Sequence, residues 1–362
     1  MQPLRRYMLG LIAAAPIAPI ALAAQADAAA AYPVVRPQKL RFPEDHGAHP
    51  AHRIEWWYLT GWLEAAGLAP FGFQLTFFQI RPGIAEDNPS RFAPDHLLVA
   101  HAALAWPQAG HLLHAARTAR GMPGLVGASV GDCDVRLDRW RLWRQAEDFR
   151  ADVDAGEFML QLAFGPTGEP LLHGEGGYSQ KAPGAEHASQ YVSLPQLPVR
   201  GRVRVGERVL AVSGKAWFDH EWSSSLMHPD AAGWDWAGIN LHDGSALMLF
   251  RMRRHDGGAL WHGGTLRRAD GTIQHFGPSD IAWQVQREWR SPRSGVRWPV
   301  GQTVRFADRI ISLAPLMDDQ ELDTRSTTGA IYWEGAVRAM EQGREVGRGY
   351  LELTGYDKAL RL

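Results

Sequence analysis

Residues 53–63 read RIEWWYLTGWL, and this stretch predicts a β-strand that is covered on both of its faces. Side chains alternate between the two faces of a strand, so Trp56 and Trp62 share one face while Trp57 and Leu59 share the other. Both faces are therefore apolar or aromatic, whereas a strand with one wet face alternates apolar with polar residues. Because each apolar face must be buried against another element, the stretch indicates a closed or layered β-structure.

Strand and turn signals continue along most of the chain, and helical periodicity is scarce. Asp243-Gly244 and Asp270-Gly271 are two-residue hairpin signals, because such turns require the positive φ that Gly tolerates. Strand-like segments lie at 71–80, 97–106, 158–164, 199–205, 209–217, 238–241, 246–252, 331–337 and 347–353. Short strands separated by turn signals predict an all-β protein of the sandwich or barrel type.

Length, charge and cysteine content exclude several classes of protein. The chain has 362 residues, which suggests about two domains at roughly 150 residues each. Its formal net charge of −1 lacks the basic excess of a nucleic-acid-binding protein, so no nucleic-acid partner is predicted. The single cysteine, Cys133, excludes an internal disulfide and a cysteine-based zinc site.

The N-terminal segment 1–31 has the layout of an export signal. Arg5 and Arg6 precede the apolar stretch Leu9–Leu22, and small residues typical of cleavage sites follow. The paired arginines also fit a twin-arginine signal, so the general secretory route and the twin-arginine route both stay open. Later segments contain no apolar run long enough for a membrane-spanning helix. We therefore expect a periplasmic or secreted protein with no transmembrane anchor after signal cleavage.

Residues 217–222, WFDHEW, place three ionisable side chains between aromatic ones. Such groups are costly to bury unless they are paired or functional. In an extended segment Asp219 and Glu221 share one face, and His220 and Trp222 share the other. His220 is thus a candidate acid/base residue, with Asp219 or Glu221 as its proton partner. The alternative is a structural network in which the carboxylates tie down loops.

Glu55 lies at the start of the aromatic strand and is a further candidate. A carboxyl group buried there would have a raised pKa and could donate a proton, or it could accept hydrogen bonds from the backbone or an arginine. His46, His49 and His52 precede it at a spacing of three. Because no carboxylate follows them at a recognisable metal-ligand spacing, we predict no metal site and no cofactor.

A third candidate segment is GWDWAGIN, residues 233–240. Trp234, Trp236 and Asn240 would lie on one face of a strand. Tryptophan faces can line an apolar ligand site or stabilise a cation, and they can equally form ordinary core.

Four segments together resemble the AttH/carotenoid 1,2-hydratase superfamily, whose members are often described as lipocalin-like proteins or predicted secreted hydrolases. These segments are Glu55–Tyr58, Ala216–Trp222, Trp234–Trp236 and Gly349–Tyr356. The resemblance covers essentially the whole mature chain and implies two consecutive lipocalin-like β-barrel domains. We place them at residues 32–222 and 223–362. Small barrels of this kind can hold one ligand, which makes an apolar ligand near the domain interface plausible.

The hydratase branch of this superfamily adds water to a terminal carbon–carbon double bond of an isoprenoid chain. The resemblance carries the functional His and Trp of its Asp-His-x-Trp motif to His220 and Trp222. The branch also uses a Tyr-x-Asp pair on a following strand, but residues 246–252 read ALMLFRM and contain no carboxylate. The resemblance therefore implies the fold more than it implies carotenoid hydration, and the sequence lies nearer the AttH branch.

Two hypotheses for function follow. The first is an exported lipocalin-like protein that binds an apolar lipid or isoprenoid near the domain interface, and the resemblance implies a link to an ABC-transport system. Its expected ligand-binding residues are Trp57, Tyr58, Trp222, Trp234, Trp236 and Asn240. The second is a hydratase or hydrolase that acts on an apolar isoprenoid-type substrate by acid catalysis. Its expected catalytic residues are His220, Asp219, Glu221 and Glu55.

Overall fold

The computed structural model describes residues 32–84, 88, 90, 92–165, 168–225 and 227–359, and the expected export signal at 1–31 lies outside them. Almost all regular structure is β-strand, and the helical elements of the described ranges are two 3-10 turns, η1 (Glu44–His46) and η2 (Pro107–Ala109). None of the helices in this part of the chain has the length and apolar character needed to cross a bilayer. The predicted all-β class is confirmed.

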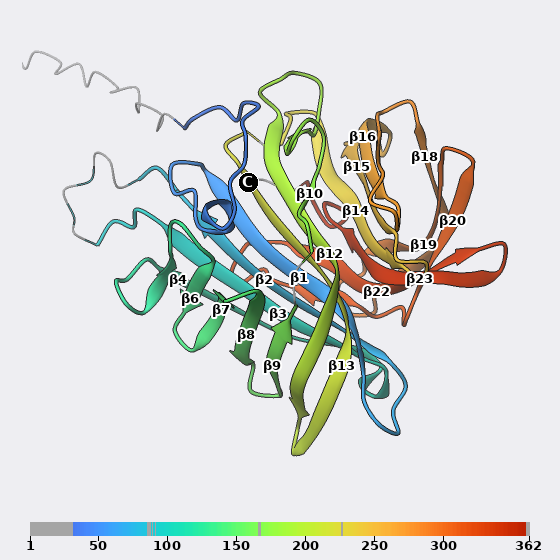
Figure 1. Cartoon of the computed structure of the whole chain (residues 1–362), viewed down its shortest axis with the longest axis horizontal. Coiled ribbons are helices and arrows are strands. Elements are labelled where there is room, and N and C mark those ends of the chain that lie inside the picture. Colours follow the sequence, from blue (N-terminus) through green and yellow to red (C-terminus); the bar gives the residue numbers. More distant parts are fainter. Residues whose placement is uncertain are drawn as a thin grey trace, which may run out of the picture.

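The first sheet has thirteen strands and curls into a nearly closed barrel (Figure 1). The strand order is β4-β3-β2-β1-β13-β12-β9-β8-β7-β6-β5, and β10 and β11 also pair with β12. Trp57, Phe73, Trp140 and Phe149 belong to its apolar core. The strands are β1 (Ile54–Glu64), β2 (Phe71–Ile80), β3 (Leu97–Trp106), β4 (His111–Arg120), β5 (Val126–Ala128), β6 (Asp134–Leu137), β7 (Trp140–Gln145), β8 (Asp148–Asp154), β9 (Phe158–Phe164), β10 (Leu171–Leu172), β11 (Tyr178–Gln180), β12 (Ala188–Val205) and β13 (Arg208–Ser223).

The second sheet has ten strands in the order β17-β16-β15-β14-β23-β22-β20-β19-β18, and β21 also pairs with β22. Its core includes Ile239, Trp298, Phe306 and Trp333. The strands are β14 (Ala231–Leu241), β15 (Ala246–Arg254), β16 (Ala259–Arg267), β17 (Ile273–Phe276), β18 (Ile281–Arg290), β19 (Arg297–Phe306), β20 (Arg309–Pro315), β21 (Glu321–Asp323), β22 (Ile331–Glu341) and β23 (Arg344–Leu353). Two consecutive lipocalin-like units, as predicted, account for both sheets.

Hairpin turns lie where the sequence signals place them. Asp243-Gly244 joins β14 to β15, and Gly244 has a φ of 89°. Asp270-Gly271 joins β16 to β17, and Gly271 has a φ of 87°. The chain changes sheet between Ser223, where β13 ends, and Ala231, where β14 begins, so the boundary predicted after residue 222 lies at the end of β13.

The strand β1 is buried on both faces, as its sequence predicts. Trp57 and Leu59 point into the core of the first barrel. Tyr58 and Trp62 point the other way, into an aromatic cluster that they share with Trp236 and other residues of the second sheet. The second sheet thus covers the outer face of β1, and this contact forms the seam between the barrels.

Gly72 on β2 allows the two sheets to approach closely. A Cβ atom at this position would lie 2.5 Å from the Tyr350 hydroxyl of β23 and 2.6 Å from the Cβ of Ala336 on β22. Both distances are too short for non-bonded atoms, so a larger residue would push the second sheet away. The seam therefore requires a residue without a side chain here.

A polar clamp holds the long hairpin of β12 and β13 against the second sheet. The pairing of β12 with β13 shifts between Leu194 and Leu197, and Gln196 there has a φ of 60°. Its backbone N–H donates to Asn240 Oδ1 at 2.7 Å, and Asn240 Nδ2 donates to the Ala216 carbonyl at 3.0 Å. Asn240 therefore satisfies backbone groups of two strands of the first sheet from a position in the second.

We predict that Asn240→Ala lowers the free energy of unfolding by about 1–3 kcal/mol, because it leaves two backbone groups of the seam without their partner. Urea-induced unfolding measures this change. Gln161→Ala on the exposed face of β9 is the matched control, since Gln161 makes one exposed hydrogen bond of 3.3 Å to Asp152. Equal stabilities of the two variants would show that the clamp contributes nothing.

Candidate functional site

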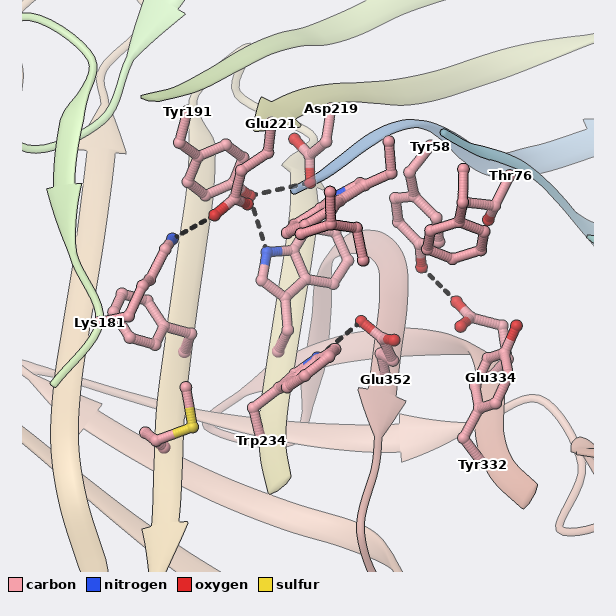
Figure 2. Close-up of a pocket in the computed structure, with 16 residues that line it drawn as sticks. Tyr58, Thr76, Lys181, Tyr191, Asp219, Glu221, Trp234, Tyr332, Glu334 and Glu352 are labelled. Carbon is pink, nitrogen blue, oxygen red and sulfur yellow. Dashed lines mark hydrogen bonds and ion pairs between the residues drawn. The ribbon is translucent and has the colours of Figure 1, made fainter. Parts of the chain in front are cut away.

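A pocket of about 90 Å³ lies in the seam between the two sheets (Figure 2). Its walls come from β1, β2, β12 and β13 of the first sheet and from β14, β15, β22 and β23 of the second. Trp56, Phe78 and Trp234 are half-buried and form its outer part, while Tyr191 and Tyr58 are buried deeper. Each sheet supplies only part of the wall, so the pocket exists because the barrels are docked.

Four carboxyl groups line this pocket: Asp219 and Glu221 from β13, Glu334 from β22 and Glu352 from β23. Glu334 is fully buried, and Asp219 and Glu221 are nearly so. Among the described residues of the lining, Lys181 is the one positively charged side chain. Ionising four acids beside one base in a mostly aromatic site is costly, so burial favours their protonated forms.

Asp219 accepts three hydrogen bonds from the first sheet. Ser193 Oγ and Trp217 Nε1 donate to its Oδ1 at 2.5 and 2.6 Å. The Tyr191 hydroxyl donates to its Oδ2 at 2.8 Å, and Figure 2 shows this hydrogen bond. Burial raises the pKa of Asp219 to about 7, although these three donors favour the ionised form. Asp219 is thus an acid that can gain and lose its proton near neutral pH.

Glu334 and Glu352 lie directly opposite each other on β22 and β23. The Tyr58 hydroxyl donates to Glu334 Oε1, while Glu334 Oε2 is buried and has no partner among the described side chains. Burial, followed by repulsion from Glu352, raises the pKa of Glu334 well above its usual value. Glu352 is half-buried and accepts a 3.0 Å hydrogen bond from Trp234 Nε1; burial raises its pKa to about 7.

Glu221 and Lys181 form an ion pair at one side of the pocket, with 3.0 Å between Nζ and Oε1. Burial raises the pKa of Glu221 and lowers that of Lys181, and each partner opposes the shift of the other. The ammonium group also lies 4.2 Å from the ring centre of Tyr191 and 4.6 Å from that of Phe250. The pair occupies Lys181, so no cation is left to balance Asp219, Glu334 and Glu352 within the lining.

This arrangement combines proton donors with an aromatic surface. A general acid works best when its pKa lies near the operating pH, which is the case for Asp219 and Glu352 at neutral pH. Faces of Tyr58 and Trp236, whose rings meet edge to face at 5.4 Å, can stabilise a positive charge that forms in the pocket. The site is therefore suited to protonating an apolar molecule.

His220 and Glu55 lie on the opposite side of β1 and β13, away from the pocket. Trp56 pairs with Glu221 and Trp57 pairs with His220, so alternation along both strands sends Glu221 and His220 to different sides. Glu55 Oε1 contacts His220 Nε2 at 2.8 Å and His49 Nδ1 at 2.7 Å. The structure thus separates the predicted catalytic residues into two groups: Asp219 and Glu221 line the pocket, while His220 and Glu55 do not.

His49 completes a network that ties η1 to the strands behind it. His49 Nε2 lies 3.1 Å from Asp45 Oδ1, and His220 Nδ1 donates to the Asp45 carbonyl at 3.0 Å. Burial opposes the charge of His49, but hydrogen bonds and attraction from Asp45 and Glu55 outweigh burial and raise its pKa to about 9. The network therefore holds a charged imidazole between two carboxylates at neutral pH.

The side chains of His49, Glu55 and His220 are also of the types that bind zinc, and their nearest ligand atoms lie within 4.8 Å of one another. In the structure these atoms meet each other directly, at the hydrogen-bond distances given above. The geometry is that of a closed polar network, and the sequence-based expectation of no metal stays a prediction.

The residues predicted to bind a ligand do not all meet. Tyr58, Trp234 and Trp236 line the pocket. Trp57 stacks on His220 with ring centres 4.8 Å apart, and Trp222 stacks on His49 at 3.6 Å, both on the far side of β1 and β13. Asn240 is the clamp of the seam and borders a second cavity of about 520 Å³. The expectation that Trp57 and Trp222 share one apolar cavity with Trp234 and Trp236 is thus corrected.

Sequence reasoning missed Glu334, Glu352, Lys181 and Tyr191 as residues of the pocket. Glu334 and Glu352 each stand among apolar residues in the predicted hairpin at 331–353, in the segments IYWEGAV and GYLEL. A glutamate at an inward position of each strand was a usable signal for a buried carboxyl pair. Lys181 gave no such signal, because it follows β11 in a polar loop.

Fold and site define a two-barrel lipocalin-like protein with an acidic, aromatic pocket between its barrels. The family model described as AttH-like matches residues 33–356, and the chain belongs to this family. It resembles the crystal structure of a candidate AttH from Nitrosomonas europaea with 43% identity and a TM-score of 0.84, over 90% of this chain and 100% of that chain.

Another solved structure shares the fold at a greater distance. Kievitone hydratase from Nectria haematococca is 14% identical, with a TM-score of 0.66 over 88% of this chain and 94% of that chain. Identity at this level establishes a common architecture. No curated protein matches the chain.

We predict that Glu334→Gln makes the stability of the protein less dependent on pH. The folded protein keeps the Glu334 proton above pH 4.5, where the unfolded chain loses it, so wild-type stability falls as pH rises by up to about 1.4 kcal/mol per pH unit. Gln cannot ionise and removes this loss. Urea unfolding at acidic and at mildly alkaline pH, with exposed Glu288→Gln as control, measures the slope; parallel slopes for all three proteins would contradict a buried, protonated Glu334.

We predict that His49 also contributes stability that is lost as pH rises, although its protonated form is charged where that of Glu334 is neutral. Its folded pKa of about 9 lies above its ordinary value of 6.5, so its stabilising effect is complete below pH 6.5 and is lost as pH rises through about 9. His49→Gln should therefore destabilise the protein most at acidic pH and least above pH 9. Thermal unfolding across this range, compared with exposed His255→Gln, checks this; a difference that does not change with pH would exclude a charged His49.

Proposed function

We propose that the pocket between the barrels binds an apolar lipid or isoprenoid-type molecule and adds water to a carbon–carbon double bond of it by acid catalysis. The observation that carries this proposal is the group of carboxyls with raised pKa, Asp219, Glu334 and Glu352, held in an aromatic pocket with no free cation in the described lining. Such acids can protonate an alkene, which is a very weak base.

The pocket is small, so only one end of a long substrate molecule would fit inside it. An engineered cavity of about 150 Å³ in another protein accepts benzene, so a cavity of about 90 Å³ has room for roughly three or four carbons, such as the branched end of a terminal double bond. The rest of the chain would then lie along the half-buried side chains of Trp56, Phe78 and Trp234. The terminal double bond of the substrate would then reach the carboxyl groups, while the rest of the substrate would lie outside the pocket.

The reaction balances with two carboxyl groups that titrate near neutral pH. Asp219, protonated, gives its proton to the less substituted carbon of the double bond, and a tertiary carbocation forms next to Tyr58 and Trp236. A water molecule adds its oxygen to the cation and loses a proton to ionised Glu352, which is half-buried and releases this proton to solvent after the product leaves. Glu334 stays protonated and acts as a neutral hydrogen-bond donor, because its pKa lies well above neutral pH.

The comparisons support this proposal at the level of architecture. The kievitone hydratase neighbour, whose name denotes a hydratase, has the same fold. In this chain the family and the lipocalin-like fold also suit binding of an apolar molecule without a reaction, and this is the second candidate function. The apolar side chains Ile54, Phe78, Phe250 and Met252 in the lining favour it.

The proposal extends to where the protein acts. The signal-like segment 1–31 supports export to the periplasm or the outside of the cell, where a small soluble carrier or enzyme would meet envelope lipids. The family resemblance supports a link to an ABC-transport system. Both points rest on sequence patterns and not on the pocket.

We predict that Asp219→Asn lowers the rate of hydration by about 10²- to 10⁴-fold, the usual contribution of a general acid. The assay uses isoprenoid alkenes with a terminal dimethylallyl group in D2O, and mass spectrometry detects the deuterium added to carbon. The wild-type rate should fall as pH rises above about 7, where Asp219 loses its proton.

Asp308→Asn, at an exposed turn position, is the matched control and should retain full activity. Binding of the same alkenes is followed by tryptophan fluorescence. Binding without deuterium incorporation in the wild-type protein would leave the carrier function and overturn acid catalysis, and absence of both binding and turnover would overturn the whole proposal.

A further inference from the structure

A continuous chain of hydrogen-bonding side chains connects Asp219 with the protein surface. Ser193 Oγ donates to Asp219 Oδ1 at 2.5 Å, and His173 Nε2 lies 2.6 Å from Ser193 Oγ. On the other side of the ring, His173 Nδ1 lies 3.0 Å from Thr265 Oγ1, and His275 Nδ1 lies 3.2 Å from the same oxygen. Each of these distances is that of a hydrogen bond.

The chain runs from the interior of the seam to solvent. Ser193 and His173 are fully buried, and Thr265 is 1% exposed. His275, directly opposite Thr265 in the pairing of β16 and β17, is exposed. The path therefore starts at a carboxyl group of the first sheet, crosses the seam between Ser193 and Thr265, and ends at an imidazole on the surface of the second sheet.

The direction of every hydrogen bond follows from the carboxylate at the inner end. Ionised Asp219 accepts only, so the single hydrogen of Ser193 Oγ points to it, and Ser193 must accept from His173 Nε2–H. Burial, then the positive charges of Lys181 and His275, lower the pKa of His173 well below its usual value. Neutral His173 then carries one hydrogen, and its bare Nδ1 accepts from Thr265. Thr265 in turn accepts from His275 Nδ1–H.

Every member of the chain thus donates toward Asp219 and accepts from the side of solvent. We propose that Ser193, His173, Thr265 and His275 form a proton wire that returns a proton from solvent to Asp219 after each reaction. This inference rests on the proposed role of Asp219 as the acid. It explains how the acid is recharged while an apolar molecule fills the pocket and closes the way past Trp56, Phe78 and Trp234.

The transfer balances one proton at each step. His275 passes its Nδ1 proton to Thr265 Oγ1, and Thr265 passes its own hydrogen to His173 Nδ1. His173 releases the proton on Nε2 to Ser193 Oγ, and Ser193 releases its hydrogen to Asp219 Oδ1, which becomes a neutral carboxylic acid. His275 takes up a proton from water at Nε2 as its Nδ1 proton leaves, so it never becomes an anion. Rotation of the two hydroxyls, with a change of tautomer at both His173 and His275, then restores the first arrangement.

The chain is more specific than a network that only fills hydrogen-bonding needs. Tyr191 and Trp217 already donate to Asp219, so Ser193 is a third donor and not required to satisfy a lone carboxylate. Thr265 Oγ1 lies within hydrogen-bond distance of two imidazole nitrogens, one from buried His173 and one from exposed His275. A hydroxyl between two imidazoles is an arrangement through which a proton can pass without movement of the backbone.

Rapid pH-jump infrared spectroscopy of the full-length protein tests the wire without any substrate. The carboxyl band of Asp219 is assigned by its loss in Asp219→Asn, and its rate of appearance after a drop in pH is measured. Thr265→Val removes the hydroxyl at nearly constant volume and should slow protonation of Asp219 by at least about tenfold. Thr265→Ser keeps the hydroxyl and should keep the wild-type rate.

His275→Ala supplies an independent variant at an exposed position, where folding is not at risk. It should slow protonation of Asp219, and added imidazole should restore the rate. Equal rates in the wild type, Thr265→Val and His275→Ala would overturn the wire, since protons would then arrive past the outer part of the pocket. Equal slowing by Thr265→Val and Thr265→Ser would also overturn it, because packing and not the hydroxyl would be responsible.

The outcome is separable from that of the proposed function. In one outcome the wire variants protonate Asp219 at the wild-type rate while deuterium incorporation still requires Asp219. That result would leave acid catalysis intact and overturn only the proposed route by which Asp219 regains its proton. Fast proton transfer along the wire in a protein that never incorporates deuterium would leave the wire in place and overturn the hydratase.

Discussion

Burial of carboxyl groups in the seam between two barrels is the constraint on which the rest of the structure depends. Asp219 reaches the seam from the first sheet, and Glu334 and Glu352 reach it from the second. In water these groups would be ionised at neutral pH, but in the seam burial raises the pKa of each of them. Docking of the barrels therefore creates the buried acidic site, because residues of both sheets form its walls.

The strands β1 and β13 divide the molecule into two functional sides. One side faces the seam and carries Asp219 and Glu221, and the other holds His220 in a polar network with Glu55 and His49. The network connects η1 to β1 and β13, and it contacts β13 through His220 on the side away from the pocket. Residues that are next to each other in the sequence thus face different surroundings: Glu221 faces the pocket, and His220 faces the polar network.

The sequence predicts features that depend on neighbouring residues, and it does not predict contacts between strands that are far apart in the chain. Alternation along RIEWWYLTGWL correctly indicates a strand covered on both faces, and alternation along WFDHEW correctly separates Asp219 from His220. Local patterns could not reveal which strands of the second barrel pack over β1. For that reason the sequence could not reveal that Glu334 lies in one pocket with Asp219, or that Thr265 lies near His173, whereas Trp234 and Trp236 were found from their own segment.

The central claim is that the seam holds an acid that exchanges its proton near neutral pH. Carbon-13 NMR of the side-chain carboxyl of Asp219, assigned through Asp219→Asn, measures its titration directly in the full-length protein. We predict a midpoint near pH 7, raised by burial from the ordinary value of 3.8. A midpoint at or below the ordinary value would contradict the account, because Asp219 would then be ionised throughout the neutral range and could not serve as the proton donor.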